Sequence, residues 1–263
     1  MADHDIPKNH PRYDSLITRE KIIKGMHRKI VAEAGLIAHG RGEAFDYILG
    51  EKSPEYALKQ EKLAVITLLL AKNPIISVNG NVVALCADEI VELGKLLNAP
   101  LEVNLFYRTQ ERIYAIEKVL RKSGAEFLYG IDPNHQETIP ELSHQRRIVD
   151  SRGIARSDCV FVPLEDGDRT MALRKLGKSV VTVDLNPLSR TSLSASVSII
   201  NNIIRAATEM VSFTKKFQGM SIQELGREKS QLNNRKLLQE ALIFMSTRLE
   251  ELASNKKTFE VNL

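Results

Sequence analysis

The sequence predicts an α/β protein with a Rossmann-like, mostly parallel sheet flanked by helices, an N-terminal helical segment and a C-terminal helix. The main observation is that short runs rich in β-branched residues alternate with amphipathic stretches of helical length over residues 73–218. A second observation is that polar residues cluster directly after several of these runs. Strands that alternate with helices form parallel sheets covered on both faces, so we expect about five or six strands.

The N-terminal segment, residues 1–72, carries two predicted helices and is expected to contribute to the functional site. The first helix is expected from Thr18 to Ala34, with an acidic residue in its first turn. The second is expected from Pro54 to Lys72, because apolar residues recur there with helical spacing. Asn73-Pro74 then ends it, since the residue before a proline disfavours helical geometry.

The core, residues 73–218, contains the predicted sheet. Strands are expected over Ile75–Val78, Leu101–Phe106, Phe127–Gly130, Cys159–Leu164, Val180–Leu185 and Ala195–Ile200. Helices are expected over Asp88–Leu97, Thr109–Ser123, Asp168–Leu176 and Asn202–Phe217. The C-terminal extension, residues 219–263, carries an amphipathic helix from Gln231 to Leu252, which could pack on its own domain or on a partner subunit. We expect the three segments to form one integrated domain.

Composition narrows the class of partner. The 263 residues are 43% hydrophobic and 27% charged, as in an ordinary globular protein. A net charge of +4 without a Lys/Arg tract favours small anionic molecules over nucleic acid. Cys86 and Cys159 lie in apolar surroundings and are expected to be buried, reduced thiols. The polar N-terminus and the lack of an apolar run of about 18 residues predict a cytoplasmic protein without a membrane partner.

A glycine-rich stretch places Gly40-Arg41-Gly42 directly after an apolar run. A backbone without side chains can approach a phosphate closely, and the guanidinium of Arg41 supplies charge and a planar fork. The alternative is a tight turn with a solvated arginine. Neither a phosphate-loop motif nor a Gly-x-Gly-x-x-Gly after a strand occurs, so a bound nucleotide must be held in a less common way.

Polar clusters follow four of the predicted strands. They are Asn79-Gly80-Asn81, Asn104 with Arg108, Glu165-Asp166-Gly167-Asp168, and Asp184-Leu185-Asn186 with Ser189-Arg190. In an open parallel sheet, ligands bind outside the carboxyl ends of the strands, so these clusters are expected to converge. Each also has a plain structural interpretation: a turn at Asn79, a helix cap at Asp168 or an Asx turn at Asp184. The histidines lack metal-ligand spacing, and a structural or solvated role is expected for His10, His27, His39 and His144.

Long stretches of the sequence resemble the archaeal phosphopantothenate synthetases, which are 4-phosphopantoate–β-alanine ligases of coenzyme A biosynthesis. The matching stretches are His10–Tyr13, Ser15-Leu16, Arg19-Glu20, Gly35–Gly50, Asn73–Asn81, Glu102–Thr109, Val162–Thr170 and Asp184–Thr191. The resemblance implies that a homodimer uses ATP to activate 4-phosphopantoate as an acyl adenylate, which β-alanine then attacks. It also implies an ATP site lined by Arg19, Arg41, Asp184, Leu185, Asn186, Ser189, Arg190, Asn201 and Asn202.

The chemistry of the side chains suggests the remaining roles. We expect catalysis to involve Arg41, Glu165, Asp166 and Asp168. Asp166 or Asp168 could hold a Mg²⁺ ion that bridges the ATP phosphates. Glu165 could instead receive the ammonium group of β-alanine and take its proton. Four residues would then remain to bind the hydroxyl, phosphate and carboxylate of the acid substrate: Asn79, Asn81, Asn104 and Arg108.

Two other functions fit the same scaffold. A nucleotide-dependent kinase would use a similar sheet and similar cations. A noncatalytic module that senses adenine nucleotides would bind them tightly without turnover, although such a module has less need for polar residues at four strand ends.

Overall fold

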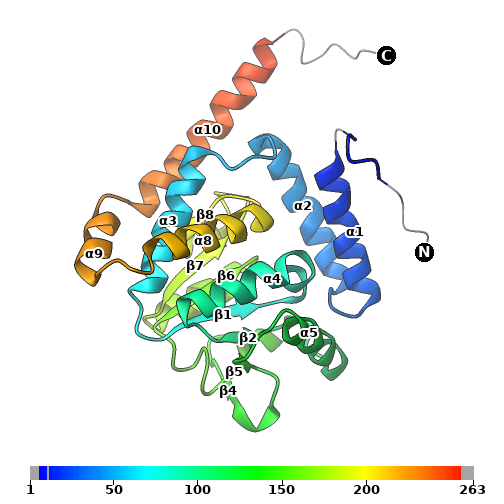
Figure 1. Ribbon diagram of the computed structural model, residues 1–263. Helices are drawn as coiled ribbons and strands as arrows, with labels where there is room; N and C mark the ends of the chain where they lie inside the picture. The colour runs from blue at the N-terminus through cyan, green and yellow to red at the C-terminus, as the bar shows by residue number, and fades with distance from the viewer. Residues whose placement is uncertain (1–5, 11, 256–263) are drawn as a thin grey trace.

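Six parallel strands form the main sheet of the computed structural model, which describes residues 6–10 and 12–255 (Figure 1). The strands are β1 (Pro74–Val78), β2 (Leu101–Val103), β3 (Leu128–Tyr129), β6 (Cys159–Pro163), β7 (Ser179–Val183) and β8 (Val197–Ile199). Their order is β3-β2-β1-β6-β7-β8, and every neighbouring pair is parallel. The predicted Rossmann-like sheet is therefore confirmed. Strand order reverses between β1 and β6, which opens a crevice at their carboxyl ends.

The sheet divides two hydrophobic cores, because successive side chains of a strand point to opposite faces. Val181 and Val183 belong to the larger core, whereas Val180 and Val162 belong to the smaller one. The helices of the larger core are α3 (Glu55–Leu69), α4 (Gly80–Leu97), α5 (Gln110–Lys122) and α8 (Ile203–Phe217). On the smaller side lies α6 (Gly167–Lys175). The two covered faces leave the ends of the strands as the place for a site.

Two N-terminal helices, α1 (Tyr13–His27) and α2 (Glu33–Leu49), stand side by side beyond the sheet, and α1 packs against α4 (Figure 1). The helix predicted from Thr18 to Ala34 is found as part of α1, but it ends at His27 rather than Ala34, because the chain turns at Lys29, whose φ is +62°. The predicted glycine-rich phosphate loop is wrong, since Gly40, Arg41 and Gly42 lie inside α2. Their backbone N–H groups therefore belong to helical geometry, and the side chain of Arg41 is what this stretch can offer a ligand.

The other predicted elements are found with shifted ends. Helix α4 begins at Gly80 rather than Asp88 and is kinked at Cys86, which has φ −149° and ψ 43°. The strand predicted to reach Phe106 ends at Val103. Elements that were not anticipated are the antiparallel pair β4 (Gln136–Thr138) and β5 (Ile148–Asp150), the 3-10 turns Pro133–His135 and Gln145–Arg147, and the short helix α7 (Arg190–Ser194).

The C-terminal extension contains α9 (Ile222–Ser230) and α10 (Asn234–Ser254), and α10 packs on α3 and α2 and runs past them (Figure 1). Leu237, Leu238 and Ala241 are buried against the same chain, so the predicted helix is confirmed and its first half covers its own domain. The parts of the predicted segments 1–72 and 219–263 that fall on residues 1–5, 11 and 256–263 lie outside the described residues.

Both cysteines are buried and free, as predicted. Burial raises the pKa of the Cys86 thiol above its ordinary value and raises the pKa of Cys159 to about 12, so neither is a ready nucleophile. Within the described part of the chain, no helix combines the length and the apolar character needed to cross a bilayer.

Candidate active site

A cavity of about 1070 Å³ lies between the two N-terminal helices and the carboxyl ends of the strands. Its walls come from α1, α2, the first turns of α4 and α8, and the loops after β2, β6 and β7. Small-molecule sites usually enclose about 300–1,000 Å³, so this cavity has room for more than one substrate. It lies at the reversal of strand order, where this class of sheet binds ligands.

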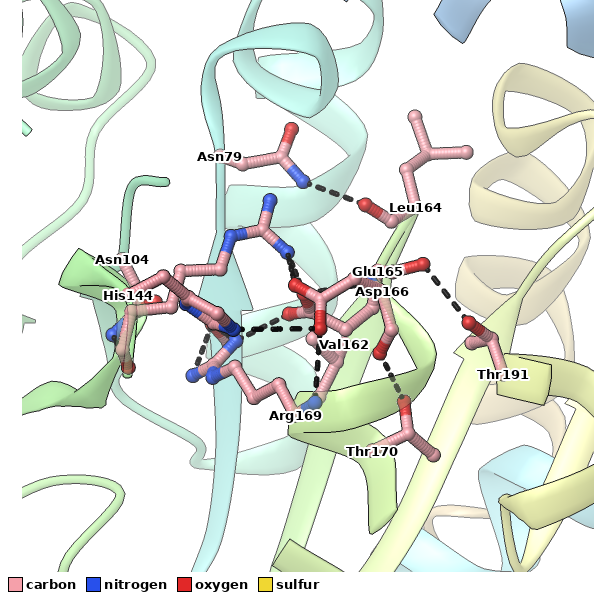
Figure 2. A network of polar contacts seen from close by, with 12 residues as sticks. Asn79, Asn104, His144, Val162, Leu164, Glu165, Asp166, Arg169, Thr170 and Thr191 are labelled. Carbon is pink, nitrogen blue, oxygen red and sulfur yellow. Dashed lines mark hydrogen bonds and ion pairs between the residues drawn. The ribbon is translucent and has the colours of Figure 1, made fainter. Parts of the chain in front are cut away.

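Asn79 ties together the two loops that meet at this reversal. Its Oδ1 accepts a hydrogen bond from the N–H of Val82 at 3.2 Å, which caps α4. Its Nδ2 donates to the carbonyl of Pro163 at 3.2 Å. It also donates to the carbonyl of Leu164 at 3.1 Å (Figure 2). Leu164 has φ +57°, a left-handed conformation that costs a branched side chain roughly 1–2 kcal/mol. The amide of Asn79 therefore holds a strained turn directly before Glu165.

Glu165 lines the cavity between two arginines. Its side chain is 1% exposed and forms ion pairs with Arg146 and with Arg169, one helical turn further on (Figure 2). Arg169 is completely buried, and it also donates to Ser77 Oγ at 3.2 Å from β1. Burial lowers the pKa of Arg146 and that of Arg169 to about 10, but both remain charged at neutral pH.

Asp166 caps the N-terminus of α6, and Asp168 does not line the cavity. The Oδ1 of Asp166 accepts from the N–H of Arg169 at 2.9 Å, and its Oδ2 lies 3.0 Å from Nη1 of Arg146. Asp168 is 58% exposed and pairs at 2.7 Å with Arg190, which is 68% exposed. Among the described residues, no group of three or more His, Cys, Asp or Glu side chains could hold a metal. Each carboxylate of the predicted Mg²⁺ pair is engaged by an arginine, Asp166 by Arg146 and Asp168 by Arg190, so the Mg²⁺ role of this pair stays a prediction.

The opposite end of the cavity is built at the start of α8. Asn202 caps this helix by accepting from the N–H of Ile204 at 3.0 Å, and its Nδ2 donates to Asp46 at 2.9 Å. Asp46 also forms a bidentate ion pair with Arg205, with N–O distances of 2.5 and 3.1 Å. This charge pair joins α2 to α8 and fixes the position of Asn202 at the cavity wall.

Asn201 supports its neighbour from the protein interior. It is fully buried, and its Nδ2 donates to Glu61 at 2.8 Å while its Oδ1 accepts from the N–H of Asn202. Burial raises the pKa of Glu61 to about 8, and the hydrogen bond from Asn201 offsets only part of this shift. The predicted pair Asn201-Asn202 therefore splits into one buried residue and one residue at the cavity.

The loop after β7 forms the Asx turn that the sequence left as an alternative. Asp184 Oδ1 accepts from the N–H of Asn186 at 2.9 Å, and its Oδ2 accepts from the hydroxyl of Ser189 at 2.5 Å. Burial raises the pKa of Asp184, whereas these hydrogen bonds and the charge of Arg41 act in the opposite direction. Leu185 is the residue of this loop that lines the cavity.

Two arginines of the N-terminal helices were predicted to bind ATP, and they differ in their partners. Arg41 lines the cavity from α2, and no described residue forms a hydrogen bond or ion pair with it. Arg19 instead binds Glu43, with both Nε–O distances at 3.0 Å. Burial alone would raise the pKa of Glu43, but hydrogen bonds from Arg19, Ser15 and Tyr47 outweigh it and hold the pKa at about 2. This ion pair therefore holds α1 against α2.

Comparison with known proteins identifies relatives over nearly the whole chain. The profile of the family described as phosphopantothenate/pantothenate synthetase matches residues 56–248. The chain belongs to this family. A protein of Thermococcus kodakarensis named 4-phosphopantoate–beta-alanine ligase is 52% identical over 95% of each chain. Proteins with the same name from Thermococcus onnurineus and Methanosarcina mazei are 51% and 47% identical, over 94% and 95% of this chain and 95% and 98% of their own.

In this family member, the two predicted residues that follow β2 brace loops. Asn104 is buried, and its Nδ2 donates to the carbonyls of Arg146 at 3.3 Å and Ile148 at 2.8 Å. Arg108 donates to the carbonyl of Gly130 at 2.7 Å. Neither side chain lines the cavity. Asn81 does line it, and its Nδ2 donates to the carbonyl of Gly35 at 2.9 Å, which joins α4 to α2.

Sequence reasoning missed several residues of this synthetase family's cavity, above all Arg112 and Arg146. Arg112 is one of several charged residues along α5, so its spacing gives no sign of a ligand site. Arg146 lies between β4 and β5, a stretch with no predicted element. His39 also lines the cavity, where burial lowers its pKa, rather than being purely structural or solvated. The signal that could have found His39 is its helical spacing from Asp46 through Gly42 along α2.

Proposed function

We propose that this protein is an ATP-dependent ligase that joins the carboxylate of 4-phosphopantoate to the amine of β-alanine. The observation that carries the proposal is the similarity of the whole chain to proteins bearing that name. The cavity supports it, because a single space at the strand ends offers cations and helix N-termini at two places. Two phosphorylated substrates bring several negative charges together, and such a site can neutralise them.

The reaction we propose has two steps. A carboxylate oxygen of the acid attacks the α-phosphorus of ATP, and the bond to pyrophosphate breaks. The amine of β-alanine then attacks the carbonyl carbon of the acyl adenylate, which forms the amide and releases AMP and a proton. Positioning and electrostatic stabilisation are sufficient for such a reaction, and no nucleophilic side chain is required.

We assign the nucleotide to the α8 end of the cavity. Arg41 offers a guanidinium that has no hydrogen-bond or ion-pair partner among the described residues, and Asn202 presents the first turn of α8. Leu185 supplies an apolar wall for the ribose or base. In this proposal Asp184, Asn186 and Ser189 shape the loop, while Asn201 fixes Asn202. Mg²⁺ would be bound through the phosphates of ATP, which is its common mode of binding, rather than in a cage of protein ligands.

Asp166 is better placed than Glu165 to receive the β-alanine ammonium. Both line the cavity, but the side chain of Asp166 is 31% exposed and that of Glu165 is nearly inaccessible. Both oxygens of each carboxylate already have protein partners, so exposure is what separates the two residues. We therefore propose that Glu165 orients the arginines and that Asp166 faces the amine.

We also propose that the protein is a homodimer that works in the cytoplasm, where its co-substrate ATP is abundant. Leu242, Ile243 and Leu249 are exposed on α10, and a second copy could cover them. Light scattering on the purified protein should give twice the chain mass of 29.5 kDa. A mass of one chain, both for the wild type and for Ile243→Glu, would reject the dimer.

Product analysis tests the reaction. Purified protein with Mg²⁺ and ATP should form AMP and pyrophosphate when 4-phosphopantoate and β-alanine are both present. Omission of either acid or amine should abolish release of phosphopantothenate. Formation of ADP and phosphate would replace the adenylate by an acyl phosphate. Nucleotide binding without consumption under any combination would favour the noncatalytic module.

A further inference from the structure

The α4 end of the cavity gathers cations close to one another. Arg112 of α5 and Arg146 both line the cavity there, and completely buried Arg169 lies behind them. The charges of Arg112 and Arg169 both lower the pKa of Arg146, so the three guanidinium groups lie within range of mutual repulsion. Glu165 and Asp166 neutralise Arg146 and Arg169. Buried Glu102 also interacts electrostatically with Arg169, and it accepts hydrogen bonds from the N–H groups of Asp150 and Ile154.

Arg112 has no carboxylate partner among the described residues. Its Nη2 donates to the carbonyl of Ile30 at 2.8 Å, and its Nη1 donates to the carbonyl of Tyr107. Desolvation by burial is the cause that lowers its pKa, and no acidic group offsets it. A half-buried cation without a counter-ion is costly. Its presence at a cavity wall therefore points to an anionic ligand.

The first turn of α4 adds positive potential at the same place. The N–H groups at the start of a helix lack partners within the helix, and the helix dipole makes this end positive. Gly80 brings the backbone close to Arg112, because a Cβ there would lie 2.9 Å from Nη2 of that arginine. The same Cβ would lie 2.0 Å from the carbonyl oxygen of Ile30, to which Nη2 donates, so an anion must reach the start of α4 and the guanidinium from the cavity that both line.

Arg146 supplies an independent observation. Only 9% of the residue is exposed, it lines the cavity, and its Nε is buried without a hydrogen-bond partner. The Nε of Arg112 is likewise unpaired. Such groups usually find partners in a complete site, since an unpaired buried donor costs about 1–3 kcal/mol. The unpaired donors of Arg112 and Arg146, together with the first turn of α4, therefore form a site that can take an anion, which we call the oxyanion cradle.

We infer that the α4 end of the cavity binds the phosphomonoester group of the acid substrate, and that Arg112 makes the enzyme specific for the phosphorylated acid over the free hydroxy acid. This inference rests on the proposed function. The α8 end already offers Arg41 and the cap of Asn202 to the nucleotide. The carboxylate of the acid must lie between the two ends, beside the α-phosphate of ATP. The phosphate group at the other end of the acid would then lie at the α4 end.

The phosphates of ATP are the other source of the same chemistry, and calorimetric titration separates the two. We would titrate 4-phosphopantoate, pantoate and ATP separately into wild type, Arg112→Gln and the control Lys118→Gln, an exposed cation of the same helix. Arg112→Gln should weaken 4-phosphopantoate about ten- to one-hundred-fold. The affinities for pantoate and ATP should remain within about twofold, and Lys118→Gln should behave as wild type.

Several outcomes would overturn the inference. A larger loss for ATP than for 4-phosphopantoate would assign the cradle to the nucleotide. Equal losses of affinity for 4-phosphopantoate and pantoate would show that Arg112 only holds the backbone at Ile30 and Tyr107 in place. Arg112→Lys addresses folding, since it keeps the charge and should recover part of the affinity for 4-phosphopantoate. Tight, Arg112-dependent binding of 4-phosphopantoate without any turnover would reject the ligase but keep the phosphate subsite.

Discussion

The two ends of the cavity use charge in different ways. At the α4 end, Glu165 is enclosed by Arg146 and Arg169, which are buried and share its two oxygens. At the α8 end, Arg205 is neutralised by Asp46, while Arg41 remains open to the cavity. Buried pairs hold the loops in place, and open cations are free to bind ligands. Stability and turnover should therefore respond to different substitutions, although the residues lie around one cavity.

The largest effect should come from removing the enclosed carboxylate. Glu165→Ala leaves two guanidinium groups without their shared partner, and breaking a buried ion pair typically costs about 3–5 kcal/mol. Urea unfolding measures this loss of free energy. If Glu165→Ala unfolded at the same urea concentration as the wild type, the ion pairs of Glu165 would not stabilise the α4 end of the cavity.

The open cation should affect turnover instead. Arg41→Ala should lower kcat about 10²- to 10³-fold, which is typical for loss of one group that stabilises developing charge. Its free energy of unfolding should change by less than about 0.5 kcal/mol, because the side chain has no described partner. Steady-state kinetics and urea unfolding on one preparation check both halves. Full activity in the folded variant would remove Arg41 from the site.

The carboxylate behind the α8 end should make stability depend on pH. The folded-state pKa of Glu61 is about 8, above its ordinary value of 4.5, so the folded protein keeps a proton that the unfolded chain loses between these pH values. Stability from this group is thus fully present at low pH and declines as pH rises toward about 8. Glu61→Gln keeps an oxygen acceptor for Asn201 and cannot titrate, so its unfolding free energy should fall less over this range.

Glu102 makes stability fall with rising pH in the same way as Glu61, because burial raises its pKa to about 7. The slope in Glu61→Gln should therefore shrink without vanishing. Glu55→Gln, on the exposed first turn of α3, serves as the control. Identical pH dependence of unfolding in wild type and Glu61→Gln would show that Glu61 is ionised in the folded protein.

The smallest effect is expected outside the cavity. Asp168→Ala removes an exposed ion pair with Arg190, and such pairs contribute about 0–1 kcal/mol. Turnover with Mg²⁺ and ATP should stay within about twofold of wild type, because the carboxylate does not line the cavity. A marked rise in the Mg²⁺ concentration needed for half-maximal rate would restore Asp168 as a metal ligand.

The sequence predicts the sheet well because local patterns determine it. The strands that contain Ile76, Phe161 and Val181 each carry a short apolar run, and their ends place Asn79 and Glu165 together. Alternation along the chain is enough to recognise such strands and to expect a site at their carboxyl ends.

The rest depends on contacts between distant segments. Glycine favours turns locally, yet α2 contains Gly35, where a Cβ would collide with the amide of Asn81, and Gly42, which packs against Leu185. Close packing of α2 thus overrides the intrinsic cost of glycine in a helix. The role of Arg112 is equally nonlocal, because its partners are backbone carbonyls of Ile30 and Tyr107.

The pairing of β1 with β6 has a consequence for the order of folding. Pro74 pairs with Cys159, so the chain between them must be synthesised before the two halves of the sheet can join. Parallel pairings across such long separations form slowly, because the entropy of loop closure is lost before the strand contacts that compensate for it can form. Asn79 can hold Leu164 only after that joining. The candidate site therefore cannot form on a nascent chain before β6 has been synthesised, although β1 and its helices can already begin a hydrophobic core.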